Sequence, residues 1–225
     1  MNVLSKLASN SVFSSLAIEN IEKIYKDAIS KKYLKGEFAT HKKDIWPYLL
    51  FVVSGEFIAT KESGQGRFFV IESFKPGEIF WGLALFEDDK PNPMAIQSSQ
   101  DGELLLWNKT QIEEIVSINP KISWGLFSLL AKTMSRAGEV VEELVFHSLP
   151  SRLANLLLDQ FEGSANDYIS RDMTLDDMAA RIGSTREMVC KMLYQFSDKG
   201  IIDIHRTEYK IKDRSALENI TKKKK

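Results

Sequence analysis

The spacing of apolar residues changes twice along the chain, and each change predicts a different kind of element. Residues 16–28 carry apolar side chains at helical spacing. Residues 33–107 instead hold short runs rich in β-branched and aromatic residues, such as LLFVVSGEFIATKES and DGELLLW, separated by glycine and proline turns. From residue 110 onward the spacing is helical again. Many short strands at this spacing predict an all-β sandwich or barrel with helices on either side of it in the sequence.

A long uninterrupted helical stretch, KISWGLFSLLAKTMSRAGEVVEELVF, follows Asn119-Pro120. A helix of about 26 residues is roughly 39 Å long, and a small β domain cannot cover so much apolar surface. Its apolar and small residues step by four and three, as in the seam of a coiled coil. We therefore expect a homodimer axis, with packing inside its own chain as the alternative. The predicted interface residues are Leu126, Leu130, Thr133, Ala137, Val140 and Leu144.

The last stretch predicts two short helices joined by a tight turn. Thr174 and Asp177 have the spacing of a capping box, and Gly183 allows the turn. Ser184 or Thr185 then caps a second helix, whose apolar residues recur at i, i+3, i+4 and i+7. The following IIDIHRTEYKIKD alternates like a β-hairpin. Together these features predict a winged helix-turn-helix.

The second helix of such a unit enters the DNA major groove by its N-terminal end. Arg186 can donate two parallel bonds to guanine, and Glu187 can accept from cytosine, although Glu187 has the spacing to close a capping box with Ser184 instead. Residues on the wing would contact phosphates, and Cys190 and Tyr194 would touch a thymine methyl or nothing. The predicted DNA-binding residues are Ser184, Thr185, Arg186, Glu187, Cys190, Lys191, Tyr194, Arg206 and Lys210.

Composition and charge do not by themselves indicate DNA binding. The 225 residues suit one large or two modest domains, and the formal net charge is −1. Residues 148–225 hold 14 basic and 12 acidic side chains, which is nearly balanced. The single cysteine rules out a disulfide framework within the chain and a cysteine-ligated iron–sulfur or zinc site. With neither a signal-peptide pattern nor an apolar run of membrane-spanning length, we expect a cytoplasmic protein that contacts no membrane.

The order of these elements resembles that of the cyclic AMP receptor protein/FNR family of transcription regulators. The resemblance is carried by FVVSGEF, FKPGEIFWGLALFED, the long helix and STREMVCKML. It implies an α+β chain with a cyclic-nucleotide-binding-like β-roll (jelly roll) in residues 1–118, a dimerisation helix and hinge in 119–147, and a winged helix-turn-helix in 148–225.

The same resemblance implies a role for the second helix. Arg186, Glu187 and Lys191 would read a TGTGA-like half-site of a palindromic operator on double-stranded DNA. Lys191 stands where arginine is commoner in the family, and lysine lacks the planar fork of arginine, which puts one base preference in doubt. RNA polymerase is a further candidate partner.

The sensor half departs from the family where a cyclic nucleotide would bind. Cyclic-nucleotide-binding members carry a glutamate for the ribose, an Arg-Ser pair for the phosphate and a small polar pair on the dimer helix; these positions read Gly82, Asn92-Pro93 and Ala137-Gly138. A buried phosphate without a cation is poorly compensated, so we expect no cyclic AMP binding of the usual kind. The predicted effector-pocket residues are Phe80, Trp81, Gly82, Leu83, Asn92, Pro93, Met94, Ala137 and Gly138. A small apolar or mixed ligand, a purely structural roll and activity without an effector all remain open.

The leading hypothesis is a homodimeric, sequence-specific DNA-binding regulator that is not an enzyme. A cupin-like metal oxygenase needs two histidines and a carboxylate, and His41 has no histidine partner in the strands. We therefore expect no catalytic residue, metal or cofactor. A regulatory module that contacts protein rather than DNA is the other alternative.

Overall fold

The computed structural model describes the chain except residues 1, 63–67, 161–167, 171–172, 206–207 and 223–225. Two compact units are present. The first comprises Met1–Lys61 and Ile71–Arg136, and the second comprises Glu62–Val70 and Ala137–Lys225. The division near residue 136 falls inside a single long helix, within the stretch 119–147 predicted to be the dimerisation helix and hinge.

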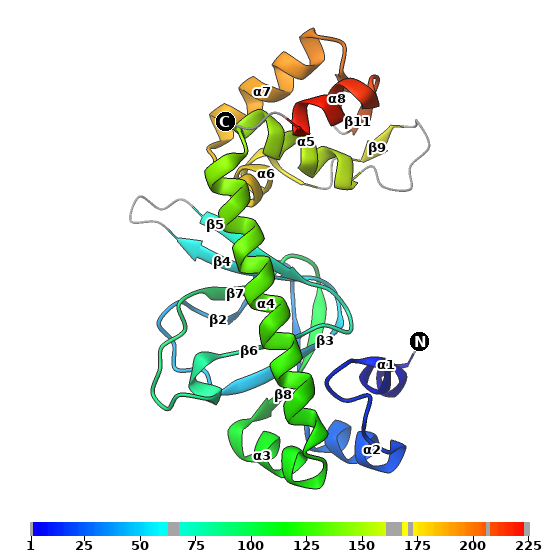
Figure 1. Ribbon diagram of the computed structural model, residues 1–225, viewed down its shortest axis with the longest axis vertical. Coiled ribbons are helices and arrows are strands. Elements are labelled where there is room, and N and C mark those ends of the chain that lie inside the picture. Colours follow the sequence, from blue (N-terminus) through cyan, green and yellow to red (C-terminus); the bar gives the residue numbers. More distant parts are fainter. Residues whose placement is uncertain (1, 63–67, 161–167, 171–172, 206–207, 223–225) are drawn as a thin grey trace. The chain divides into compact units, whose positions relative to one another are not determined.

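Two antiparallel four-stranded sheets form the β-roll, as the sequence predicted (Figure 1). One sheet has the strand order β1-β8-β3-β6 and the other has the order β2-β7-β4-β5. The strands are β1 (Ile29–Tyr33), β2 (Phe38–Thr40), β3 (Tyr48–Ser54), β4 (Phe57–Glu62), β5 (Phe68–Phe74), β6 (Ile79–Trp81), β7 (Ala95–Ser98) and β8 (Gly102–Asn108), with the 3-10 helix η1 (Leu83–Leu85) after β6.

Strand β3 is apolar at nearly every position because both of its faces are covered. Leu49 and Phe51 point into a core cluster that also contains helix residues. Leu50 and Val52, which alternate with them, point into the space between the two sheets. This double coverage explains why the run LLFVV does not show the apolar–polar alternation of a half-exposed strand.

Helices cover one face of the β1-β8-β3-β6 sheet (Figure 1). They are α1 (Val3–Ser9), α2 (Ile18–Asp27), α3 (Lys109–Ile118) and α4 (Lys121–Phe146). Asn108 and Gln111 form a capping box that starts α3 directly after β8. The buried Trp107 ring donates from Nε1 to the carbonyl oxygen of Ile24 at 2.8 Å, which ties α2 to this sheet.

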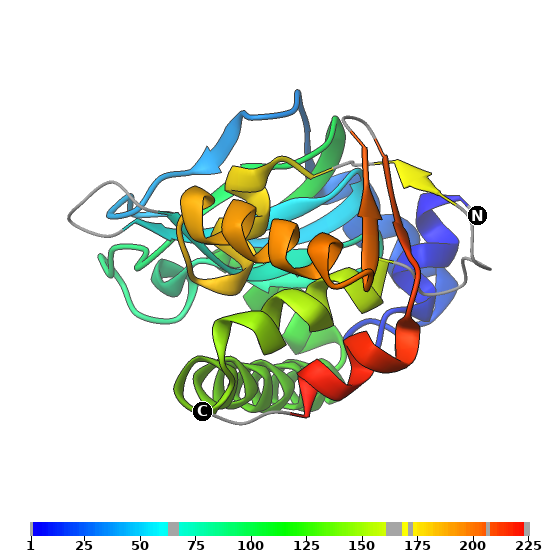
Figure 2. The ribbon, with the colours of Figure 1, turned by 90° about the horizontal axis from the view of Figure 1, so that it is seen from above.

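The second unit contains the predicted winged helix-turn-helix. Its elements are α5 (Leu149–Gln160), β9 (Ile169–Ser170), α6 (Leu175–Ile182), α7 (Arg186–Asp198), β10 (Ile202–Ile204), β11 (Glu208–Ile211) and α8 (Arg214–Thr221). The Thr174–Asp177 capping box is confirmed, and Gly183 ends α6 in the left-handed conformation with φ of +63°. Figure 2 shows α7 beside the β10–β11 hairpin, with α5 between α7 and α8.

One element of this unit was not predicted. The segment EGSANDYISRD has the glycine, serine and asparagine content of a loop, but Ile169 and Ser170 within it form the short strand β9. Strand β9 pairs antiparallel with β11, so the wing is a three-stranded sheet with the order β10-β11-β9. A two-residue strand is held by backbone pairing to β11 and needs no apolar repeat of its own, which is why the pattern did not reveal it.

Candidate DNA-binding helix and sensor site

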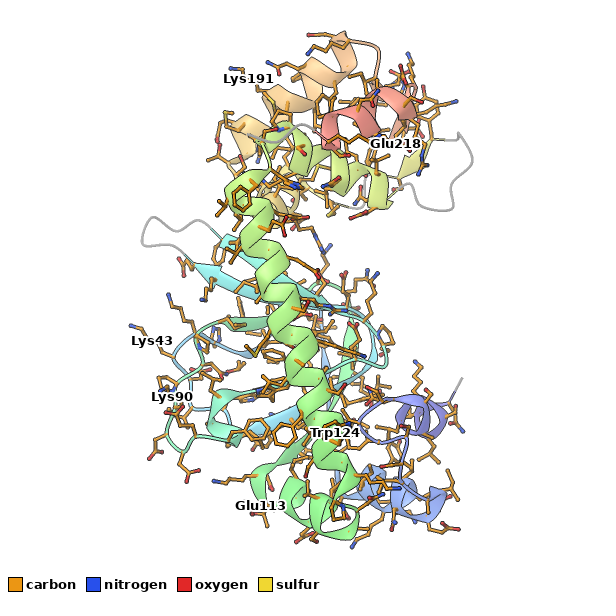
Figure 3. All side chains as sticks on the ribbon, viewed as in Figure 1. Lys43, Lys90, Glu113, Trp124, Lys191 and Glu218 are labelled. Carbon is orange, nitrogen blue, oxygen red and sulfur yellow. The ribbon has the colours of Figure 1, made fainter. Side chains whose placement is uncertain are left out.

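Helix α7 is anchored by one apolar face, as predicted. Val189, Met192, Leu193 and Phe196 are all buried in the core cluster of the second unit. The side chains of Arg186, Glu187, Lys191 and Tyr194 are exposed, and Figure 3 shows Lys191 projecting from α7. Cys190 is half-buried between the two faces. The helix therefore presents charged groups at its N-terminal end and is held from the opposite side.

The N-cap of α7 shows whether Glu187 closes a capping box with Ser184 or is free to contact a base. Thr185 is the N-cap residue, and its hydroxyl accepts from the backbone N–H of Met188. The third helical residue is thus Met188, so Glu187 does not close a capping box with Ser184. The backbone N–H of Glu187 itself and the Thr185 hydroxyl lower the pKa of the Glu187 carboxyl below its ordinary value. Glu187 therefore stays ionised and can accept a hydrogen bond.

Arg186 has a partner within the helix-turn-helix. Its Nη1 donates to Oδ2 of Asp176 at 3.2 Å. Asp176 lies in the first turn of α6, so the pair links the N-terminal ends of the two helices. Sequence reasoning did not single out Asp176, although two consecutive acids at the start of the first helix were visible.

On the wing, Lys210 lies 5.7 Å from the centre of the Tyr168 ring. The Tyr168 hydroxyl donates to Asp203 Oδ2 at 2.8 Å, and Lys212 Nζ lies 3.2 Å from the same oxygen. The bond to Asp203 raises the pKa of Tyr168, and the bond from Tyr168, aided by Lys212, lowers the pKa of Asp203. Arg206, the other predicted wing contact, lies outside the described residues. Sequence reasoning did not single out Tyr168, because the segment around it has the composition of a loop.

In the first unit, Asn92 and Gly82, the positions that the resemblance assigns to phosphate and ribose recognition, are both closely packed. Asn92 is buried; its Oδ1 accepts from the Leu83 N–H at 3.2 Å and its Nδ2 donates to Thr40 Oγ1 at 3.1 Å. A Cβ added to Gly82 would lie 1.8 Å from the carbonyl oxygen of Trp46. A glutamate at residue 82 would therefore require the backbone to move.

The other predicted pocket residues do not share one environment. Phe80 and Met94 pack against the core between the sheets, whereas Pro93 is exposed. Ala137 and Gly138 are exposed and belong to the second unit. Only Trp81 and Leu83 of the predicted set line the large cavity described next.

A cavity of about 770 Å³ opens in the first unit between η1, α3 and α4, and its walls are mostly apolar. Sequence reasoning placed no pocket at α3 because the helix shows only an ordinary amphipathic pattern. The lining residues are Trp81, Leu83, Leu85, Phe86, Lys109, Ile112, Glu113, Val116, Ser117, Ser123, Leu126, Phe127 and Leu130.

The exposed apolar side chains of α4 lie partly on the predicted seam and partly beside it. Of the predicted residues, Leu126 packs against the core cluster that includes α1, α2 and α3, and Thr133, Val140 and Leu144 are half-buried. Leu130 and Ala137 are exposed, as a dimer seam requires. The exposed large side chains include Trp124 at 78%, Phe127 at 64% and Met134 at 68% exposure. Figure 3 labels Trp124 on α4. A seam with steps of three and four runs through Trp124, Phe127, Ala131, Met134, Gly138, Val141 and Val145.

Two further findings concern the described residues alone. No group of three or more histidine, cysteine, aspartate or glutamate side chains in this part of the chain is arranged to hold a metal ion. None of the helices described here has the length and apolar character needed to traverse a bilayer.

Comparison with known proteins agrees with this architecture. The family model described as cyclic nucleotide-binding domain matches residues 30–119, and the model described as Crp-like helix-turn-helix domain matches residues 151–220. The CRP-like cAMP-activated global transcriptional regulator of Mycobacterium tuberculosis is 23% identical over 217 residues, covering 94% of this chain and 96% of the relative.

Solved structures show the same fold. A putative transcriptional regulator of the crp/fnr family from Eubacterium rectale has a TM-score of 0.78 at 20% identity, covering 94% of this chain and 98% of that one. The c-di-GMP responsive global regulator CLP of Xanthomonas campestris has a TM-score of 0.76 at 17% identity, covering 87% and 99%.

A β-roll followed by a long helix and a winged helix-turn-helix defines a transcription regulator that binds DNA through its helix-turn-helix. The chain belongs to the CRP/FNR family of such regulators, whose members are not enzymes.

Proposed function

We propose that this protein is a homodimeric regulator that binds a palindromic operator and is not controlled by cyclic AMP. The observation that carries the proposal is the orientation of α7, which buries Val189 and Phe196 and exposes Arg186, Glu187 and Lys191. Arginine, glutamate and lysine side chains at the leading end of such a helix match the hydrogen-bonding edges of base pairs in the major groove. The matched family models at 30–119 and 151–220 support domain boundaries at 1–118, 119–147 and 148–225.

The homodimer rests on the exposed stripe of α4. A heptad repeat of apolar and small side chains that the chain itself leaves uncovered fits a parallel pair of helices. Two copies joined in this way would hold their α7 helices about 34 Å apart, one turn of duplex, so that each reads one half of a palindrome. Such a regulator acts in the cytoplasm, where the DNA lies. RNA polymerase is a candidate partner.

Independence from cyclic AMP rests on Gly82 and Asn92. No cation stands at residue 92 to neutralise a cyclic phosphate, and the backbone at residue 82 has no space for an acidic side chain. The fold does not require cyclic AMP, since the Xanthomonas campestris relative is described as responsive to c-di-GMP. A different small effector, apolar or mixed in character, fits the walls of the α3–α4 cavity better than a cyclic nucleotide does.

The test is selection of bound duplexes from a random pool, combined with native mass spectrometry of the same protein. We expect a two-fold symmetric consensus, a mass of two chains per duplex, and no mass shift when cyclic AMP is added. A monomer would overturn the homodimer, and a shift by the mass of cyclic AMP would overturn the claim about the effector. Failure to retain any duplex would favour a module that contacts protein, a class that the nearly balanced charge of residues 148–225 also fits.

A further inference from the structure

The side chains of Asp176 and Arg186 form an ion pair on the surface that contains the leading end of α7. The side chains are 68% and 62% exposed, respectively, and the Nη1–Oδ2 distance is 3.2 Å. An ion pair this exposed contributes little to folding, because water and salt screen it and two long side chains lose freedom to form it. The contact restricts the positions that the Arg186 guanidinium adopts while adding little to the stability of the fold.

Asp176 also changes the charge at the start of α6. The first helix of a helix-turn-helix crosses the DNA backbone, and a helix N-terminus ordinarily favours a phosphate. Here the first turn of α6 holds Asp176 and Asp177. Asp177 is engaged in the capping box with Thr174, whereas Asp176 extends to Arg186. A carboxylate at this place repels the phosphates of the DNA backbone, whatever the base sequence.

We infer that Asp176 sets the sequence specificity of this protein by acting on Arg186, an inference that rests on the proposed function. Arginine has five N–H donors, so Arg186 can keep one bond to Asp176 and still direct two parallel donors at O6 and N7 of a guanine. Asp176 thereby orients the guanidinium before DNA arrives.

The same ion pair also weakens binding to DNA that lacks the matching sequence. Where no guanine faces Arg186, its charge is already balanced by Asp176, and fewer counterions are released when a phosphate approaches. Binding to unrelated sequences is then weak, while the matching sequence gains the two directed hydrogen bonds.

The experiment uses Asp176→Asn in the full-length protein, with Glu218→Gln as the matched control. Glu218 also pairs with an arginine, at 3.0 Å from Arg214, but it lies on α8, which packs on α5. Dissociation constants are measured for the selected operator and for a random duplex at several salt concentrations. Thermal melting of each variant verifies that it is folded.

We expect Asp176→Asn to tighten binding to the random duplex by about 5-fold or more and to change operator binding by much less, so that the specificity ratio falls. Glu218→Gln should change both constants by less than about 2-fold. Asp176→Glu, which retains the carboxylate, should recover most of the wild-type ratio. Equal effects of the two neutralising variants on both duplexes would overturn the inference.

A double-mutant cycle separates orientation of Arg186 from simple charge. Arg186→Ala alone should lower the preference for one base by roughly 10-fold or more. In that background Asp176→Asn should no longer alter the base preference, because Asp176 has no guanidinium to orient. If Asp176→Asn altered the base preference equally with and without the Arg186 side chain, Asp176 would act only through its surface charge and not by orienting Arg186. A wild-type protein that selects no consensus would instead refute the proposed function itself.

Discussion

Asn92 and Thr40 are joined inside the β-roll by a hydrogen bond of 3.1 Å from Nδ2 to Oγ1. The same amide accepts from the Leu83 N–H, and the backbone of Asn92 bonds to Lys43 and Asp44. Asn92 therefore connects β2, the loop after it and η1. The position at which the resemblance places a phosphate-binding arginine is here a structural cross-link.

Replacement of Asn92 by alanine should lower the free energy of unfolding by about 1–3 kcal/mol, because the buried Thr40 hydroxyl loses a partner and the Leu83 N–H loses its acceptor. Urea unfolding measures the change. Lys90→Ala is the control, since Lys90 is exposed in the same loop and its pair with Glu87 is screened by water (Figure 3). If Asn92→Ala and Lys90→Ala had equal effects, the cross-link would be unimportant.

The exposed seam of α4 predicts how the dimer is held. In a parallel pair, the knob at residue 124 of one chain packs beside residues 123, 124 and 127 of the other. Ser123 and Phe127 also line the α3–α4 cavity, so Trp124 of the partner subunit would rest at its edge. Trp124→Ala should raise the dissociation constant of the dimer by about 30-fold or more, as loss of an aromatic anchor in a packed interface does.

Sedimentation at several protein concentrations measures that change. Lys132→Ala serves as the control, because Lys132 is exposed on the same helix and stands outside the seam. A dimer that tolerates Trp124→Ala as well as it tolerates Lys132→Ala would place the interface elsewhere.

The α4 helix shows what sequence can and cannot predict here. Its length and its heptad steps were evident, but two overlapping stripes satisfy the same steps, and only the packing of Leu126 against the core selects the exposed one. The buried face of α7 was predictable because one regular helix determines it. The Asn92–Thr40 and Arg186–Asp176 contacts join residues 52 and 10 positions apart, and no local pattern indicates which polar side chains the fold brings together.

Lys210 predicts a salt effect on DNA binding. Its amine lies near the Tyr168 ring on the wing, where a phosphate contact would release about one counterion. Lys210→Ala should weaken binding to the operator and to random duplex by the same factor, and it should reduce the slope of log K against log salt by about one. A slope equal to that of the wild type would show that Lys210 does not contact the DNA backbone.

The Tyr168–Asp203 bond predicts a change of pKa on the wing. Tyr168→Phe removes the hydroxyl that contributes most to the low pKa of Asp203, so this pKa should rise toward its ordinary value of 3.8 while Lys212 keeps it somewhat lower. Because a depressed carboxyl pKa stabilises the fold only above the pKa of the unfolded chain, this contribution is lost as the pH falls through the folded-state value. NMR titration of the Asp203 carboxyl in both proteins measures the difference. Identical titration curves would mean that the Tyr168 hydroxyl does not lower the pKa of Asp203.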